Sequence, residues 1–175
     1  DGAVVAVDDI DMDGAEKVAA EIVAAGGQAT AFSANVTKSG EVRAMVDAVL
    51  THFGKVDILV NNAGGGAALL GKTSAFRDMA EEVWKWVVDL NLYGTMICTQ
   101  SVLDHMIERR YGKIINFGSI AGVCGLPNWA AYSAAKGAII SLTKTLAMEV
   151  GEYGINVNCI SPGAILSRPG SDWSR

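Results

Sequence analysis

The sequence lacks an excess of positive charge, which narrows the kinds of partner that the protein can bind. Its 175 residues include 14 lysine and arginine residues against 19 aspartate and glutamate residues, a net charge of −5. Nucleic-acid-binding surfaces and surfaces that bind anionic membranes need the opposite balance. We therefore expect a small-molecule substrate as partner, with no nucleic acid and no membrane.

Cysteine and histidine are also scarce. The three cysteines, Cys98, Cys124 and Cys159, are too few and too scattered for a disulfide framework or a zinc site. Their spacing fits a reducing compartment and predicts a cytoplasmic protein. The two histidines, His52 and His105, stand outside any metal-like cluster. We expect no metal site.

Long apolar runs are missing too, although half of the residues are hydrophobic and the mean hydropathy is +0.28. No run reaches the roughly 18 residues that a membrane-spanning helix needs. The chain opens without a signal peptide or an initiator methionine, and its end, from Ser167 to Arg175, is rich in polar and turn residues. We interpret it as a fragment, with residues 1–175 forming a single, partial dinucleotide-binding and catalytic domain.

Short apolar runs alternate with amphipathic segments of helical length, a pattern that predicts an α/β fold with a parallel sheet. The runs are continuous, as in strands that helices cover on both faces. The expected strands are Ala3–Val7, Ala29–Phe32, Val56–Val60, Lys113–Phe117 and Ile155–Ile160. The expected helical segments are Met12–Ala25, Glu41–Phe53, about Glu81–Arg109 and Ala130–Gly151.

Polar residues and glycines follow these strands, at the edge of a parallel sheet where ligands bind. Asp8 and Asp9 follow the first run, where a carboxylate can accept hydrogen bonds from the adenosine ribose of NAD and repel a 2′-phosphate. The alternative is an aspartate that starts a helix. The third run is followed by two amides and a row of glycines, which let the backbone approach a flat ligand, in the segment Asn61-Asn62-Ala63-Gly64-Gly65-Gly66.

A serine, a tyrosine and a lysine suggest acid–base chemistry. Ser119 ends the fourth run, while Tyr132 and Lys136 lie four residues apart and so share one helix face. A phenol has an ordinary pKa of about 10, and a nearby ammonium lowers this pKa because it stabilises the phenolate. Tyr132 is therefore a candidate proton shuttle. Such a pair also occurs on ordinary solvated helices, so its specificity comes from the other motifs.

In their order along the chain, these motifs resemble those of the short-chain dehydrogenase/reductase family. The matching residues are Asp9, Asn35-Val36-Thr37, Asn61-Asn62-Ala63-Gly64, Asn91, Ser119, Tyr132-x-x-x-Lys136 and Pro162-Gly163. The resemblance implies a three-layer Rossmann-like doubly wound parallel sheet, incomplete at both ends. It also implies an oxidoreductase that transfers a hydride between a nicotinamide cofactor, NAD rather than NADP, and a secondary alcohol or ketone of the ketoacyl or sugar-alcohol type.

The resemblance also implies roles for individual residues. Ser119 would hold the substrate oxygen, Tyr132 would exchange its proton, Lys136 would bind the nicotinamide ribose and favour the ionised phenol, and Asn91 would position a water. The implied cofactor-binding residues are Asp9, Asn35, Val36, Asn61, Ala63, Gly64, Tyr132, Lys136, Pro162, Gly163, Ile165 and Ser167. The family further implies a homodimer or homotetramer formed through the two long helices.

The family's glycine-rich turn, Thr-Gly-x-x-x-Gly-x-Gly, is absent together with the strand before it. That strand lies between the first and third strands expected here, so we expect a gap in the sheet and two unpaired strand edges. The closing strand is absent as well. We therefore assign the activity to a parent enzyme and expect the fragment alone to be inactive.

Two other functions stay open. One is a catalytically silent binding protein, favoured by the missing turn and opposed by the intact Ser119, Tyr132 and Lys136. The other is a nucleotide-sugar epimerase or dehydratase, which also uses the Tyr-x-x-x-Lys pair but is normally longer. Trp129, three residues before Tyr132, is expected in a core or an interface, with substrate contact as the alternative.

Overall fold

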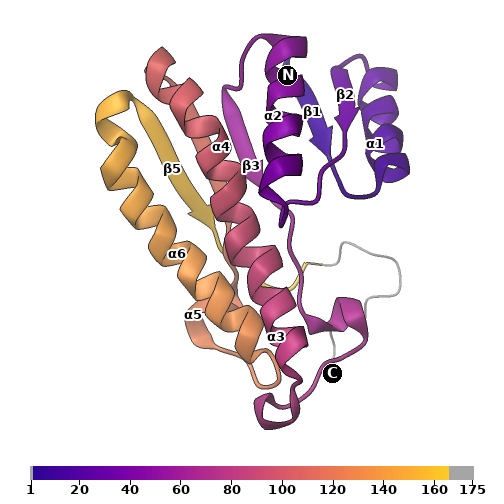
Figure 1. Ribbon diagram of the computed structural model, residues 1–175, viewed down its shortest axis with the longest axis vertical. Coiled ribbons are helices and arrows are strands. Elements are labelled where there is room, and N and C mark those ends of the chain that lie inside the picture. Colours follow the sequence, from indigo (N-terminus) through magenta and orange to yellow (C-terminus); the bar gives the residue numbers. More distant parts are fainter. Residues whose placement is uncertain (1, 166–175) are drawn as a thin grey trace.

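The computed structural model describes residues 2–165, in which parallel strands alternate with helices along the chain (Figure 1). The strands are β1 (Val4–Asp8), β2 (Gln28–Phe32), β3 (Ile58–Asn61), β4 (Gly112–Phe117) and β5 (Ile155–Ile160). The helices are α1 (Met12–Ala24), α2 (Ser39–Phe53), α3 (Glu81–Val88), α4 (Gly94–Arg109), α5 (Ile120–Cys124) and α6 (Ala130–Val150). The five expected strands are all present, each shifted by two residues at most.

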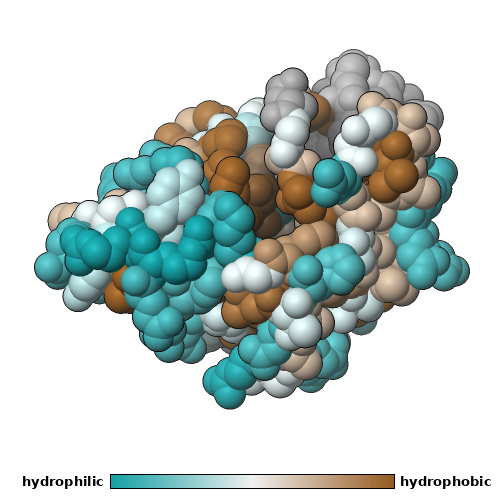
Figure 2. Space-filling view, turned by 90° about the horizontal axis from the view of Figure 1, so that it is seen from above, coloured by the Kyte–Doolittle hydropathy of each residue, from teal (hydrophilic) through white to brown (hydrophobic). Residues whose placement is uncertain are grey.

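The strands form two separate parallel sheets. β1 pairs with β2, and β3, β4 and β5 pair in that order, while β1 and β3 do not pair with each other. This confirms the gap expected between the first and third strands. Side chains on both sides of it are exposed, with Val4 at 50% and Ile58 at 53%. In the view from above, hydrophobic residues gather around a hollow near the middle of the molecule (Figure 2).

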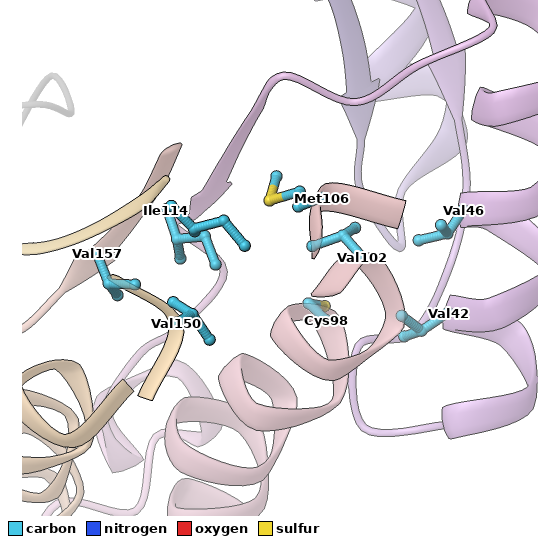
Figure 3. Close-up of a cluster of buried hydrophobic side chains, with 9 residues drawn as sticks. Val42, Val46, Cys98, Val102, Met106, Ile114, Val150 and Val157 are labelled. Carbon is cyan, nitrogen blue, oxygen red and sulfur yellow. The ribbon is translucent and has the colours of Figure 1, made fainter. Parts of the chain in front are cut away.

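The sheet β3–β4–β5 is buried on one face, where the core lies. Buried side chains from two strands, α2, α4 and the end of α6 meet there (Figure 3), and they are Val42, Val46, Cys98, Val102, Met106, Ile114, Val150, Ile155 and Val157. Gly112 leaves room for Met106, because a Cβ atom there would collide with the sulfur of this side chain.

The opposite face of this sheet carries exposed apolar side chains. Ile58, Val60 and Ile160 are each about half exposed, at 53%, 50% and 49%. Within residues 2–165, helices therefore cover this sheet on one face, whereas the continuous apolar runs are typical of strands covered on both. The α/β class and the parallel strands are as expected.

The segment expected as one long helix, about Glu81–Arg109, is divided. A π-helical turn, Asp89–Tyr93, separates α3 from α4. A π turn adds one residue to the helical repeat, and such turns occur often at functional sites. Here the turn contains Asn91, which is completely buried.

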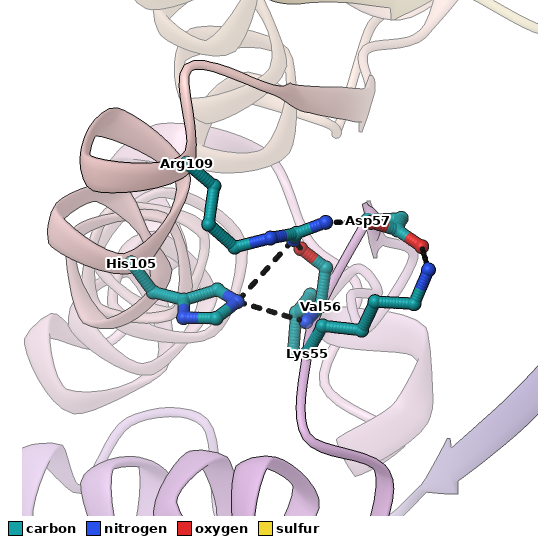
Figure 4. A network of polar contacts seen from close by, with 5 residues as sticks. All are labelled: Lys55, Val56, Asp57, His105 and Arg109. Atoms are coloured by element: carbon teal, nitrogen blue, oxygen red, sulfur yellow. Dashed lines mark hydrogen bonds and ion pairs between the residues drawn. The ribbon is translucent and has the colours of Figure 1, made fainter.

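A polar network ties the start of β3 to the end of α4 (Figure 4). The guanidinium of Arg109 donates to Asp57 Oδ1 at 2.6 Å and to the carbonyl of Val56 at 3.1 Å. The backbone N–H of Val56 donates to His105 Nε2 at 3.2 Å, and Lys55 pairs with Asp57 at 2.8 Å. Hydrogen bonds from Lys55 and Arg109 hold the pKa of Asp57 below its ordinary value of 3.8.

Candidate active site

Tyr132 and Lys136 lie together on the first turns of α6. The ammonium nitrogen of Lys136 is 5.6 Å from the centroid of the Tyr132 ring. Lys136 is 5% exposed, and its ammonium donates to the carbonyl of Phe117, at the end of β4, at 2.7 Å. Burial lowers the pKa of Lys136 to about 8. The side chain is therefore still mostly cationic at neutral pH, beside the phenol.

Ser119 is held against the same helix. It is the N-cap residue of α5, and its Oγ accepts a hydrogen bond from the backbone N–H of Ala121 at 3.1 Å. The hydroxyl group of Ser119 has no hydrogen-bond acceptor among the described residues, so it can donate a hydrogen bond to a ligand. Close contact between α5 and α6 needs Gly122, because a Cβ there would lie 2.6 Å from backbone atoms of Lys136 and Gly137.

Asn91 connects the π turn to the glycine-rich loop after β3. Its side-chain nitrogen donates to the carbonyls of Val87 and Gly65 at 2.7 and 2.8 Å, and its Oδ1 accepts from the N–H of Gly65 at 3.1 Å. A Cβ on Gly64 would lie 2.6 Å from Asn91 Oδ1 and 3.3 Å from Lys136 Nζ. Asn91 thus holds this loop against Lys136, while its role toward a water stays a prediction.

Asn61 is used inside the protein. Its side-chain nitrogen donates to Thr99 Oγ1 at 2.9 Å and to Asn116 Oδ1 at 2.8 Å. Asn116 in turn donates to Thr143 Oγ1 at 3.0 Å. Asn61 thereby connects β3 to α4 and β4, and its partners Thr99 and Asn116, like Thr143, are not among the residues predicted from the sequence. A signal was present, since Asn116 interrupts an apolar strand.

The acidic pair ends β1. Asp9 is exposed, and its Oδ1 accepts from the N–H of Asp11 at 3.0 Å, just before α1 begins. Asp8 is partly buried, and its Oδ1 has no hydrogen-bond partner among the described residues. Burial, followed by the charge of Asp9, raises the pKa of Asp8 to about 6. This oxygen can therefore accept a hydrogen bond from a ligand hydroxyl.

The remaining expected cofactor contacts lie at the ends of β2, β3 and β5. Asn35 Oδ1 accepts from both the backbone and the hydroxyl of Thr37, at 3.0 and 2.7 Å, so its amide shapes the local turn. Val36 contacts Gly94, where a Cβ would lie 2.8 Å from Val36 Cγ2. The backbone carbonyl of Pro162 accepts from the N–H of Ile120 at 3.0 Å. Ala63, Gly64, Gly163 and Ile165 are exposed, and Ser167 lies outside the described residues.

A narrow pocket opens beside the Tyr132 ring. Its walls come from the loops after β3, from the π-turn side of α3 and from the start of α6. The lining residues are Ala67, Ala68, Thr73, Met79, Val87, Asn128, Trp129, Ala131 and Tyr132. Most of these were not found from the sequence, because residues separated by some 60 positions meet only in the folded chain.

Within residues 2–165 no group of three or more histidine, cysteine, aspartate or glutamate side chains could hold a metal ion.

In the same part of the chain, no helix is both long and apolar enough to pass through a bilayer.

Comparison with known proteins places these motifs in a family context. The short chain dehydrogenase family matches residues 1–174. The chain is 42% identical over 151 residues to a 3-oxoacyl-[acyl-carrier-protein] reductase of Synechocystis sp., covering 86% of this chain and 59% of that protein. It is 44% identical over 155 residues to the corresponding reductase of Staphylococcus epidermidis, covering 89% and 62%. The chain thus spans about six tenths of the length of these relatives.

Solved structures give a similar result. NAD⁺-bound xylitol dehydrogenase superposes with a TM-score of 0.84 at 38% identity, over 91% of this chain and 60% of that one. A gluconate 5-dehydrogenase from Burkholderia cenocepacia, in complex with NADP and tartrate, superposes with a TM-score of 0.86 at 33% identity, over 93% and 62%. The similar structures therefore include one with NAD and one with NADP.

Proposed function

The chain belongs to the short-chain dehydrogenase family, and from this premise we propose that the protein is an oxidoreductase that uses NAD to interconvert a secondary alcohol and a ketone. Tyr132 is the general acid and base in this proposal. The observation that carries it is the buried ammonium of Lys136, 5.6 Å from the Tyr132 ring centroid and fixed to the carbonyl of Phe117.

The residues present fit the two riboses of a nicotinamide dinucleotide. The glycine-rich loop after β3 passes close to Lys136: a Cβ on Gly64 would lie 3.3 Å from the Lys136 ammonium nitrogen. At the end of β1, the unpartnered Oδ1 of Asp8 offers an acceptor for a ribose hydroxyl. When bound, the cofactor supplies the hydride to the carbonyl carbon or accepts it from the alcohol carbon.

The chain's own residues handle the oxygen and its proton. Ser119 donates a hydrogen bond from its free hydroxyl to the substrate oxygen and holds this oxygen beside the phenol. Tyr132 donates a proton to this oxygen when a ketone is reduced and accepts one when an alcohol is oxidised. Lys136 favours the phenolate, because an ammonium stabilises a nearby negative charge, and its remaining N–H groups can donate hydrogen bonds to the nicotinamide ribose. Asn91 holds the glycine loop against which the ribose lies.

Asp9 supports the choice of NAD. Its carboxylate is exposed at the end of β1, where a 2′-phosphate would meet both its charge and that of Asp8. The partial accessibility of Asp8, with its pKa raised to about 6, leaves it mostly ionised at neutral pH. Two carboxylates at one strand end thus oppose the phosphate that distinguishes NADP.

We propose a ketoacyl-type substrate before a sugar alcohol. The named 3-oxoacyl reductases are 42% and 44% identical to this chain. The lining of the pocket beside Tyr132 is mainly apolar and contains no charged side chain, which suits an acyl chain better than a polyol. The cytoplasmic location stays a prediction.

We also propose that α4 and α6 pair subunits in a homodimer or homotetramer. Met96 on α4 and Met148 on α6 are 41% and 77% exposed. Exposed methionines on two long helices suit an interface between copies, because this flexible apolar side chain adapts to its neighbours.

A direct assay tests the proposed activity. The full-length protein is incubated with NADH or NADPH and a series of 3-oxoacyl esters and polyol-derived ketones, and cofactor oxidation is followed by absorbance. We expect oxidation of NADH with the 3-oxoacyl esters. The absence of turnover with every ketone and both cofactors, in a protein that binds NADH, would favour the catalytically silent alternative.

A further inference from the structure

Trp129 is fixed at the beginning of α6, three residues before the proposed proton donor. Its backbone N–H donates to the carbonyl of Leu126 at 3.2 Å, and its carbonyl accepts from the N–H of Ser133 at 2.7 Å. These two bonds anchor the residue on both sides. The direction in which its indole leaves the backbone is therefore set by the helix start.

The indole is packed between the Tyr132 ring and the loop after β3. The centroids of the two rings are 5.3 Å apart, with an edge-to-face angle of 71°. On the other side, a Cβ on Gly66 would lie 3.0 Å from Cζ3 of Trp129. The indole therefore lies close to the loop backbone, and a Cβ at position 66 would force it to shift.

The pocket that this indole borders is apolar and nearly full. Apart from Trp129 and Tyr132, its wall consists of alanine, valine and methionine side chains with two uncharged polar residues, Thr73 and Asn128. The free space within it is about 10 Å³, the room of about one water molecule. A substrate group turned toward the indole must therefore be small, and burying an apolar group there costs no hydrogen bonds.

We infer that Trp129 determines substrate specificity: its indole limits the group on the Trp129 side of the reacting carbon to an apolar group of about methyl size. The inference rests on the proposed function, since it assumes that the reacting oxygen lies at the Tyr132 hydroxyl. It adds a rule for selecting among ketones. The larger substituent of the substrate must then extend away from the indole. This orientation fixes which face of the carbonyl receives the hydride, and hence the stereochemistry of the alcohol.

The test compares two esters that differ only in this group, ethyl 3-oxobutanoate with a methyl and ethyl 3-oxo-3-phenylpropanoate with a phenyl. For the full-length holoenzyme we expect kcat/KM to favour the methyl ester by roughly 100-fold or more, the scale on which pocket size discriminates.

Trp129→Ala should reduce this ratio of kcat/KM values at least tenfold and lower the enantiomeric excess of the product alcohol. Leu126→Ala is the matched control, an exposed residue on the same loop that does not line the pocket, and should change neither value.

A second variant separates a specificity role from general damage to the fold. The backbone of Gly66 is extended, with φ −94° and ψ 178°, so alanine fits its conformation and meets only the indole. Gly66→Ala should push the indole into the pocket and lower kcat/KM for the methyl ester several-fold. In the Trp129→Ala background the same change should have no effect, because its collision partner is gone.

Binding measurements keep the inference distinct from the proposed activity. In the complex with NAD⁺ a ketone cannot be reduced, so calorimetry gives the dissociation constant of each ester without turnover. We expect Trp129→Ala to tighten binding of the phenyl ester at least tenfold and to leave the methyl ester nearly unchanged. An ester ratio within twofold of wild type in both kinetics and binding would overturn the inference. Turnover of neither ester, together with the expected binding shift, would overturn the proposed activity, while the size limit that Trp129 sets on the bound ester would stand.

Discussion

The ammonium nitrogen of Lys136 lies 5.6 Å from the centroid of the Tyr132 ring, one helical turn away on α6. The same nitrogen is fixed by the carbonyl of Phe117 at 2.7 Å, so the charge has a defined position. A buried ammonium with one carbonyl acceptor has capacity for two further hydrogen bonds. Its remaining donors are free to act on a phenolate and on a ribose.

Removing the Tyr132 hydroxyl tests the proton donor. In the full-length protein, Tyr132→Phe keeps the ring and its contact with Trp129, and we expect kcat to fall by at least ~10²-fold, the usual contribution of a general acid. The dissociation constant of NADH should change little. Steady-state kinetics and fluorescence titration measure the two quantities, and a kcat within tenfold of wild type would remove Tyr132 from this role.

The cofactor preference depends on Asp9. We expect wild-type kcat/KM to be higher with NADH than with NADPH, because two carboxylates at the end of β1 repel a 2′-phosphate. Asp9→Ser should shift the ratio toward NADPH by tenfold or more, on the order of one charge interaction. Asp13→Ser, in the first turn of α1, is a matched control that should leave the ratio unchanged. A wild-type preference for NADPH would contradict the assignment.

The polar network at the start of β3 predicts a pH-dependent contribution to stability. Asp57 has a pKa below its ordinary value of 3.8, because Lys55 and Arg109 donate hydrogen bonds to it. Its contribution is therefore fully present above about pH 4 and is lost as the pH falls through the lowered pKa. Asp57→Asn should lower the free energy of unfolding at pH 7 by about 1 kcal/mol and have a smaller effect near pH 3.

Urea unfolding of the full-length protein at the two pH values measures this difference. Asp78→Asn is the matched control, since Asp78 pairs only with its neighbour Arg77 and its side chain is 59% exposed. We expect its effect to be smaller than that of Asp57→Asn. Equal effects of the two substitutions at pH 7, or an Asp57→Asn effect that grows toward pH 3, would contradict the interpretation.

Residues 1–175 expressed alone should fold poorly. The strands β1 and β3 leave backbone groups unpaired at the gap between the two sheets, and Val4, Ile58 and Val60 are about half exposed. Several apolar side chains left unburied at roughly 1.5–3 kcal/mol each can consume a net stability of ~5–15 kcal/mol. We expect an aggregating or partly molten protein without measurable NADH binding. A monodisperse protein with a sharp unfolding transition and micromolar NADH affinity would refute this.

The strands and the Tyr132–Lys136 pair were predictable because they depend on local order. Apolar runs of strand length mark the strands wherever they pair, and a spacing of four residues brings two side chains together on any helix. The expected strand Ile155–Ile160 agrees with β5 at both ends. The gap between β1 and β3 was also foreseen, though from the family resemblance rather than from the residues.

The π turn and the pocket were not predictable from local patterns. The segment from Glu81 to Arg109 has the composition of one long helix, and the turn at Asn91 forms through bonds to Gly65, 26 residues away. The pocket likewise joins Thr73 and Met79 to Trp129 and Tyr132. Such contacts depend on tertiary packing. The periodicity of a single segment carries no information about which distant segments pack against it.

The buried bonds of Asn61 with Thr99 and Asn116, and of Asn116 with Thr143, have a consequence for the alignment of the strands. Asn61 and Asn116 are register partners in β3 and β4. A slip of one residue, about 3.3 Å along a strand, would turn these amides to the other face and leave buried hydroxyls without partners. The amides thus fix the register of the two strands. They keep the end of β3, where the glycine loop begins, beside the end of β4, where Phe117 and Ser119 lie.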